Sequence, residues 1–309
     1  MSADRPAFAI VGFGEAGAIF GGHLVRMGCA VAAFDRLQAE PGAREGILGR
    51  MRATGVRPAA DQADAARGAG IVLSTVTAAE AVRVAEHAAP GLRAGQVYLD
   101  LNSVRPEAKR AVAEIVGRAG AEMVEGVAMD TVPLRGAAVP LLLCGAGAAD
   151  LAARLGALGL SAEAIGPDLG LASRLKLLRS ILVKGMEALF AEAMEAAGTP
   201  ELAHRVADSL TATHPGLDWR AVIGHGLSRS ALHGARRAAE MRECAAMLEA
   251  AGVEPLMATA TALRQERTAE RAFFRDPSGA SIEAFLKALR SHAGARAEAH
   301  GVAARADQS

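Results

Sequence analysis

Two patterns of apolar residues divide the chain. In the first half, short apolar runs rich in β-branched residues alternate with stretches in which apolar residues recur at helical spacing. Short continuous apolar runs are typical of strands buried on both faces, and their alternation with helices is typical of a parallel α/β sheet. We therefore predict a mainly parallel, doubly wound sheet with strands at Phe8–Val11, Ala30–Phe34, Ile71–Val76, Val97–Leu101, Glu122–Val124 and Leu141–Cys144.

After Gly166-Pro167-Asp168 the strand-like runs almost cease, and apolar residues recur with the period of a helix. We predict a long helix over Leu171–Ala197, ended by Gly198-Thr199-Pro200. Further helices are predicted over Pro200–Thr211, Trp219–Gly224, Ser228–Ala251, Glu254–Arg271 and Ser281–His292, with His225 in a loop. The expected domains are an α/β domain over residues 1–165, an all-α domain over 166–295 and a polar tail over 296–309.

Composition narrows the function classes. The chain has 309 residues, 51% of them hydrophobic, so it can bury a sizeable core. Its 34 Lys and Arg residues balance 34 Asp and Glu residues, which gives no overall attraction to nucleic acid or an anionic membrane. No apolar run approaches the roughly 18 residues of a membrane span, and we see no targeting segment. The three cysteines are widely spaced, so we expect a cytoplasmic protein with no metal site and no disulfide framework.

A glycine motif follows the first predicted strand and opens a helical stretch. Gly12 is placed for a tight turn, Gly14 for close approach of a pyrophosphate, and Gly17 for close packing of the helix on the sheet. The helix N-terminus then directs its N–H groups at the phosphates. The motif predicts a dinucleotide-binding Rossmann domain, with an ordinary tight turn as the alternative. The predicted cofactor-binding loop is Gly12-Phe13-Gly14-Glu15-Ala16-Gly17.

Asp35 ends the next predicted strand, where a carboxylate accepts hydrogen bonds from the adenosine ribose. This favours NAD over NADP, because a carboxylate there repels a 2′-phosphate. Arg36 follows directly and is able to pair with that phosphate, so NADP stays an alternative. A solvated strand-end residue is the other interpretation of Asp35.

The long helix contains the segment Gly170-Leu-Ala-Ser-Arg-Leu-Lys176-Leu-Leu-Arg179-Ser180. With the glycine loop, this segment resembles the β-hydroxyacid dehydrogenase superfamily, which includes phosphogluconate and hydroxyisobutyrate dehydrogenases. The resemblance covers nearly the whole chain and implies a Rossmann domain, an all-α domain and Lys176 as the catalytic acid/base. The family usually has an asparagine that orients the substrate where this chain has Ser180.

The same helix has two distinct faces. Lys176, Ser180 and Lys184 step by four along one face, and a second face is apolar. We expect the apolar face to pack and the polar face to present cations, with solvated surface lysines as the alternative. Arg179 and Lys184 are expected either to lower the pKa of Lys176 or to bind a substrate anion. The apolar face consists of Leu171, Leu175, Leu178, Leu182 and Leu189.

Two strand-end segments also match the family. Asn102 and Ser103 stand where the family contacts the substrate, and Thr75 and Val76 stand where it lies beside the cofactor. Ligands of open α/β sheets bind at such strand ends. The alternative for Asn102-Ser103 is the N-cap of a helix that begins near Pro106.

Two other segments bear on the substrate. Met129-Asp130-Thr131 replaces the Ser-Gly-Gly that binds the substrate carboxylate in the best-known members. Thr131 and nearby backbone are candidates for anion binding, whereas Asp130 repels an anion unless it points away.

The segment Leu232–Met241 and Lys184-Gly185 resemble a branch whose C-terminal domain has no assigned function. There His233, Arg236 and Arg237 line the substrate cleft of this chain or, in a dimer, the cleft of its partner; the alternative is a charged helix face, for example with an Arg236–Glu240 pair.

The sequence thus predicts an NAD(P)-dependent oxidoreductase that moves hydride between nicotinamide and a small, anionic hydroxy acid or alcohol. Lys176 is the predicted acid/base, and Asn102, Ser103 and Ser180 orient the substrate. The predicted substrate-binding residues are Thr131, Arg179, Lys184 and His233. Family precedent implies a homodimer. The rival is a non-catalytic dinucleotide-binding or redox-sensing protein, which the missing Ser-Gly-Gly favours and the retained Lys176 disfavours.

Overall fold

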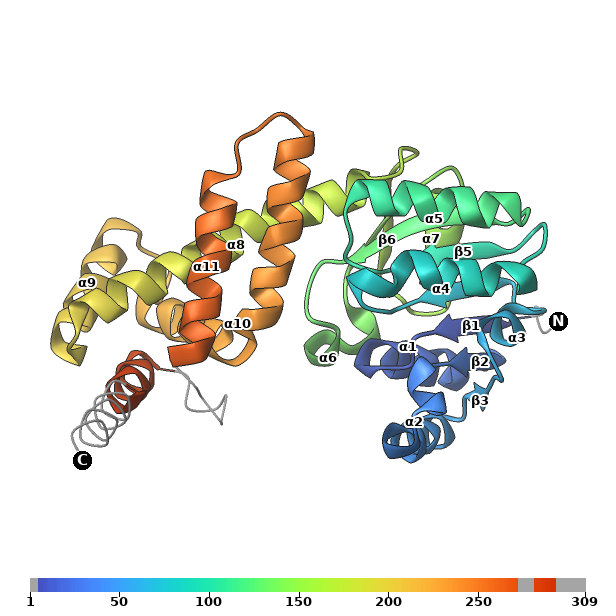
Figure 1. The fold of residues 1–309 in the computed structure, drawn as a ribbon, viewed down its shortest axis with the longest axis horizontal. Coiled ribbons are helices and arrows are strands. Elements are labelled where there is room, and N and C mark those ends of the chain that lie inside the picture. The colour runs from blue at the N-terminus through green and yellow to red at the C-terminus, as the bar shows by residue number, and fades with distance from the viewer. Residues whose placement is uncertain (1–4, 272–280, 293–309) are drawn as a thin grey trace, which may run out of the picture. The chain divides into compact units, whose positions relative to one another are not determined.

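The chain forms two compact units, Met1–Lys176 and Leu177–Ser309, in a computed structural model that describes residues 5–271 and 281–292 (Figure 1). The units divide inside the long helix α8 (Leu171–Ala197), whereas the sequence places the domain boundary near residue 165. The predicted polar tail, 296–309, lies outside the described residues. None of the helices in the described part of the chain is both long and apolar enough to cross a membrane.

The first unit is built on an eight-stranded sheet with the order β3-β2-β1-β4-β5-β6-β7-β8. All neighbouring strands are parallel except β6 and β7, which confirms the predicted mainly parallel sheet. The chain reverses its direction of winding between β1 and β4, which is where open α/β sheets bind ligands. The strands are β1 (Phe8–Val11), β2 (Val31–Phe34), β3 (Arg57–Pro58), β4 (Ile71–Ser74), β5 (Val97–Asp100), β6 (Glu122–Ala128), β7 (Leu141–Cys144) and β8 (Ala162–Gly166).

Helices cover both faces of the sheet because its central strands are apolar on both faces. On β1, Phe8 and Ile10 belong to one core cluster and Ala9 and Val11 to another. The first cluster includes side chains of α1, α2 and α7, and the second includes side chains of α3, α4 and α5. These helices and the short α6 are α1 (Glu15–Arg26), α2 (Pro41–Thr54), α3 (Gln62–Ala66), α4 (Ala81–Ala88), α5 (Pro106–Arg118), α6 (Val132–Arg135) and α7 (Ala148–Ala157).

The second unit is helical in its described residues. It contains most of α8, then α9 (Pro200–Thr213), α10 (Trp219–Ala250), α11 (Leu256–Arg271) and a helix over 282–292. The sequence predicts two helices where α10 is one, and His225 lies on α10 rather than in a loop. The glycines around it are close-packing positions: a Cβ at Gly226 would come 3.0 Å from Phe190 of α8, and one at Gly234 would overlap the α11 backbone at Gln265.

The two faces of α8 are used in the opposite way to the prediction. The leucine face is exposed, with 69% of Leu182 accessible to solvent, whereas Ser180 and Lys184 are each 7% exposed. Leu177, on a different part of the helix circumference, packs in a core cluster with residues of α10 and α11. Periodicity separates the faces of a helix, but it does not identify which face its neighbours cover.

Candidate functional site

The glycine loop joins β1 to α1 with each glycine in a distinct role. Gly12 has φ +91°, and a Cβ there would come 2.6 Å from the Thr75 carbonyl oxygen. The Thr75 hydroxyl donates a hydrogen bond of 2.7 Å to the Gly12 carbonyl, and a Cβ at Gly17 would overlap that same carbonyl. A Cβ at Gly14, by contrast, would meet no atom within 4 Å. The loop is therefore closed by Gly12 and Gly17 and open at Gly14, which fits a dinucleotide pyrophosphate.

Asp35 is fixed between the glycine loop and the turn that follows β2. Its Oδ2 accepts a hydrogen bond of 2.7 Å from the Phe13 N–H, and its Oδ1 accepts one of 3.0 Å from the Leu37 N–H. It thereby caps a single turn of 3₁₀-helix, Arg36–Ala39. Arg36 is exposed and pairs with Glu40 at 3.1 Å. Asp35 is therefore an anchored carboxylate beside the loop and not only a solvated strand-end residue.

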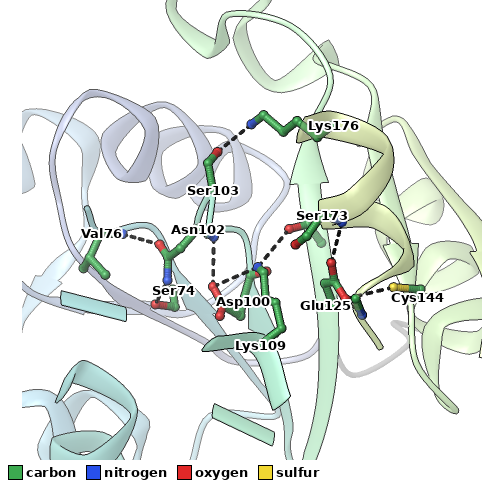
Figure 2. Close-up of polar contacts among 12 residues, drawn as sticks. Ser74, Val76, Asp100, Asn102, Ser103, Lys109, Glu125, Cys144, Ser173 and Lys176 are labelled. Atoms are coloured by element: carbon green, nitrogen blue, oxygen red, sulfur yellow. Dashed lines mark hydrogen bonds and ion pairs between the residues drawn. The ribbon is translucent and has the colours of Figure 1, made fainter. Parts of the chain in front are cut away.

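Asn102 ties together the ends of β4 and β5. It is 2% exposed; its Oδ1 accepts a hydrogen bond of 2.6 Å from the Val76 N–H, and its Nδ2 donates one of 2.9 Å to Ser74 Oγ (Figure 2). The N-cap of α5 is Arg105, so neither Asn102 nor Ser103 is the helix cap. The side chain of Asn102 thus holds the loop that contains Thr75 and Val76 in place.

A buried ion pair supports this strand end. Lys109 and Asp100 are both fully buried, with Lys109 Nζ 3.3 Å from Asp100 Oδ1. Lys109 also donates a hydrogen bond of 2.8 Å to the Asp100 carbonyl, and Asp100 Oδ1 accepts one of 2.8 Å from the Asn102 N–H. Burial raises the pKa of Asp100, and the Lys109 ammonium opposes that rise. Sequence reasoning missed Lys109, a cation on the buried face of α5.

Glu125 of β6 joins the sheet to the first turn of α8. Its carboxylate is fully buried and accepts hydrogen bonds from the Gly170 N–H and, at 2.6 Å, from the Ser173 N–H (Figure 2). The thiol of Cys144, on the neighbouring strand β7, donates to the same carboxylate at 3.1 Å, and burial raises the pKa of this thiol to about 11. A carboxylate from the sheet thus takes the place of an N-cap for α8. The sequence signal for Glu125 is an acid in the middle of a predominantly buried strand.

Lys176 lies one turn after Ser173 and points to the end of β5. Its Nζ donates a hydrogen bond of 2.6 Å to Ser103 Oγ, and both residues are half-buried (Figure 2). Ser103 follows β5, and the glycine loop follows β1, two strands away in the parallel part of the sheet. The structure therefore brings the predicted acid/base, Ser103, Asn102 and the glycine loop to the same end of the sheet, where the parallel strands finish.

Thr131 lies at the start of the short helix α6. Its N–H donates a hydrogen bond of 2.7 Å to Asp130 Oδ1, and Asp130 Oδ2 lies 2.7 Å from Arg135 Nε. The Thr131 N–H is therefore engaged by its neighbour, and the charge of Asp130 faces a cation. The segment that replaces Ser-Gly-Gly is thus organised by its own charged residues.

The remaining candidates lie in the helical unit. Lys184 is buried and bound to Glu240 and Ser180, whereas Arg179, His233 and Arg236 are exposed. Glu240, which the charged-face alternative pairs with Arg236, lies 2.7 Å from Lys184 Nζ of α8. Within residues 5–271 and 281–292, no group of three or more His, Cys, Asp or Glu side chains is placed to hold a metal ion.

Arg237, next to the predicted Arg236, is the cation of its segment that is buried. It is 2% exposed and pairs with Glu187 of α8. Burial lowers its pKa to about 10.

The first unit is an α/β domain with a glycine loop of the dinucleotide-binding type and a lysine at the same end of its sheet, and a helical unit follows it. This combination is typical of two-domain nicotinamide-dependent dehydrogenases. Comparisons agree: residues 7–128 match the NAD binding domain of 6-phosphogluconate dehydrogenase, and residues 197–268 match a domain of unknown function, DUF1932. No curated protein matches this sequence.

Solved structures share the fold of the chain. The chain is 37% identical to a conserved hypothetical protein from Sinorhizobium meliloti 1021, over 94% of this chain and 97% of that one, with a TM-score of 0.76. It is 28% identical to a conserved protein of unknown function said to resemble 3-hydroxyacid dehydrogenases, over 85% and 97%, with a TM-score of 0.70. It shares its fold with 3-hydroxyisobutyrate dehydrogenase of Mycobacterium tuberculosis, at 19% identity over 93% and 99% and a TM-score of 0.73.

The chain therefore belongs to the β-hydroxyacid dehydrogenase superfamily, in the branch whose C-terminal domain has no assigned function. Its NAD-binding domain and its relatives support an NAD(P)-dependent oxidoreductase.

Proposed function

We propose that the protein transfers hydride between a nicotinamide dinucleotide and a small, anionic hydroxy acid or alcohol, with Lys176 as the acid/base. The observation that carries this proposal is the Lys176 Nζ–Ser103 Oγ contact of 2.6 Å, at the end of the sheet where the glycine loop lies. A lysine held there by a hydroxyl group is placed to exchange a proton with a bound alcohol.

The residues fit the cofactor in three places. The open side of Gly14 and the first N–H groups of α1 suit the pyrophosphate, Asp35 suits the ribose hydroxyls, and the loop at Thr75 and Val76 suits the nicotinamide side. When bound, the nicotinamide supplies the hydride acceptor or donor. Asp35 is held by the loop itself while Arg36 pairs with Glu40, which supports NAD over NADP.

The protein side chains then handle the proton. In the oxidation direction the neutral amine of Lys176 takes the substrate hydroxyl proton while the carbinol carbon loses its hydride, which leaves a ketone or an aldehyde. In the reduction direction the Lys176 ammonium returns that proton. Ser103 holds the lysine and the substrate oxygen in register, and Asn102 keeps the adjoining loop fixed. Arg179, exposed one turn after Lys176, supplies a second cation for an anionic substrate.

A homodimer accounts for the exposed leucine face of α8. Leu178, Leu182, Met186 and Leu189 follow one another at helical spacing and are all exposed in the single chain. We infer that a second copy of the chain covers this face, because burial of such an apolar stripe is favourable by roughly 25 cal/mol per Å².

The test is nicotinamide absorbance at near-neutral pH, with NAD and NADP separately, across a panel of hydroxy acids and their keto or aldehyde partners. Turnover of one panel member, faster with NAD, is the expected result. Tight NADH binding without turnover of any member would instead favour the redox-sensing alternative.

A further inference from the structure

Ser180 is the inner end of a series of polar side chains in the helical unit. Lys184 Nζ lies 3.0 Å from Ser180 Oγ and 2.7 Å from Glu240 Oε2. Ser180 and Lys184 come from α8, whereas Glu240 comes from α10, within the segment that matches the domain of unknown function. Ser180 and Lys184 are buried, whereas 35% of the Glu240 side chain is exposed, so the series leads from the surface to a buried hydroxyl.

The direction of these hydrogen bonds follows from the groups themselves. An ammonium group has three N–H donors and no acceptor, so Lys184 donates both to Glu240 and to Ser180. Ser180 Oγ therefore accepts, and its own O–H proton points away from Lys184. A free serine hydroxyl rotates, whereas the asparagine usual in this family has fixed N–H donors. Lys184 thus fixes the orientation of the Ser180 hydroxyl, which would rotate freely without it.

The surroundings keep the Lys184 ammonium committed to these two partners. Burial lowers the pKa of Lys184, and the Glu240 carboxylate opposes that shift. The other groups that face it are Arg237 and Cys244 of α10, and the Cys244 thiol has a pKa raised to about 12 by burial, so it is neutral. On α11, Gln265 Nε2 donates to the Lys184 backbone carbonyl at 3.2 Å. The Arg237 guanidinium adds to the lowering of the Lys184 pKa, whereas Glu240 binds the ammonium and Gln265 binds the backbone carbonyl.

We propose that Lys184 and Glu240 are positioning residues that orient the Ser180 hydroxyl as a hydrogen-bond donor to the substrate, and that Lys184 does not bind the substrate itself. The inference rests on the proposed function, because Ser180 meets the substrate only if Lys176, one turn earlier on α8, is the acid/base. It assigns the matched domain of unknown function a task, since that domain supplies Glu240.

The test measures kcat and KM for the substrate found with the wild-type chain, in the full-length variants Ser180→Ala, Lys184→Met and the double variant. Each single change is expected to lower kcat/KM about tenfold, the usual effect of one lost hydrogen bond. The double variant is expected to lose no more than Ser180→Ala, because Lys184 acts only through Ser180. Lys184→Arg should recover most of the loss, since a guanidinium also only donates.

The matched control is Arg264→Met, which breaks the ion pair between Arg264 and Glu195, 2.7 Å apart in the same unit. It should keep wild-type kcat/KM. If Lys184→Met does not fold, Glu240→Gln serves instead and should lower kcat/KM severalfold relative to this control.

Wild-type kinetics in the Lys184 and Glu240 variants, or losses that multiply in the double variant, would overturn the proposal and leave the proposed function standing. A wild-type chain that turns over no hydroxy acid would defeat the proposed function, and this inference with it.

Discussion

The Glu125 carboxylate binds the first turn of α8 and thereby sets the position of Lys176, so Glu125→Gln is the most informative single substitution. In the wild type, Oε1 accepts from the Ser173 N–H at 2.6 Å and Oε2 accepts from the Gly170 N–H. Glutamine keeps one carbonyl oxygen, but its amide nitrogen only donates. One of the two main-chain N–H groups at the start of α8 is therefore left facing a donor.

The size of the effect follows from these contacts. A hydrogen bond to a charged group contributes about 1.5–3 kcal/mol, and a negative charge at a helix N-terminus contributes about 0.3–1 kcal/mol more. The neutral amide is easier to bury than the carboxylate, which offsets part of this loss. We expect the free energy of unfolding to fall by about 2 kcal/mol. Turnover should fall about tenfold, because the turn before Lys176 is no longer fixed.

The assay combines urea unfolding with hydrogen exchange of the Gly170 and Ser173 amides. Ser173→Ala is the matched control, because its hydroxyl is buried and, among the described residues, has no hydrogen-bond partner. That variant keeps the Ser173 N–H bond to Glu125 and should change the unfolding free energy by less than about 0.5 kcal/mol. If Glu125→Gln matches Ser173→Ala in stability and in amide protection, the assignment of Glu125 as the helix anchor is wrong.

Three further predictions follow from other parts of the structure. Asp35→Ala should weaken NADH binding about tenfold and leave NADPH binding less affected, by fluorescence titration, since the ribose acceptor is lost; equal losses for both would contradict the assignment. Leu182→Glu should shift the chain from dimer to monomer in light scattering at micromolar concentration, and a wild-type monomer would refute the dimer. Cys144 and Cys244, buried thiols whose pKa values are raised to about 11 and about 12, should resist iodoacetamide at pH 7.5 until the protein unfolds, as mass spectrometry would show.

The strands that are buried on both faces could be predicted from the sequence, and the exposed strands at the two edges of the sheet could not. The apolar runs of β1 and β7 are predicted with their observed bounds. β3 has two exposed residues, and β8 at the other edge is half-exposed and rich in alanine, so neither produces a continuous apolar run. Edge strands are defined by pairing with a neighbour, which a local pattern does not contain.

The site could be predicted in its motifs but not in its supports. Lys176, Ser103 and the glycine loop could be predicted because each stands in a local motif or at a family position, and the structure places them at the same end of the sheet. Glu125 and Lys109 were missed because their roles depend on partners far along the chain. For the same reason the sequence predicts Lys184 at the surface of α8, although Glu240 of α10 and Gln265 of α11 bind it where it is buried.

The central claim is that Lys176 moves the substrate proton, and the most direct measurement is kcat of Lys176→Met against Arg174→Met. Arg174 is an exposed cation on the same helix and in the same unit, so its loss controls for charge and helix stability. We predict that Lys176→Met lowers kcat on the order of a thousandfold with NADH binding retained, and that Arg174→Met keeps wild-type turnover. Full turnover by Lys176→Met would contradict the account.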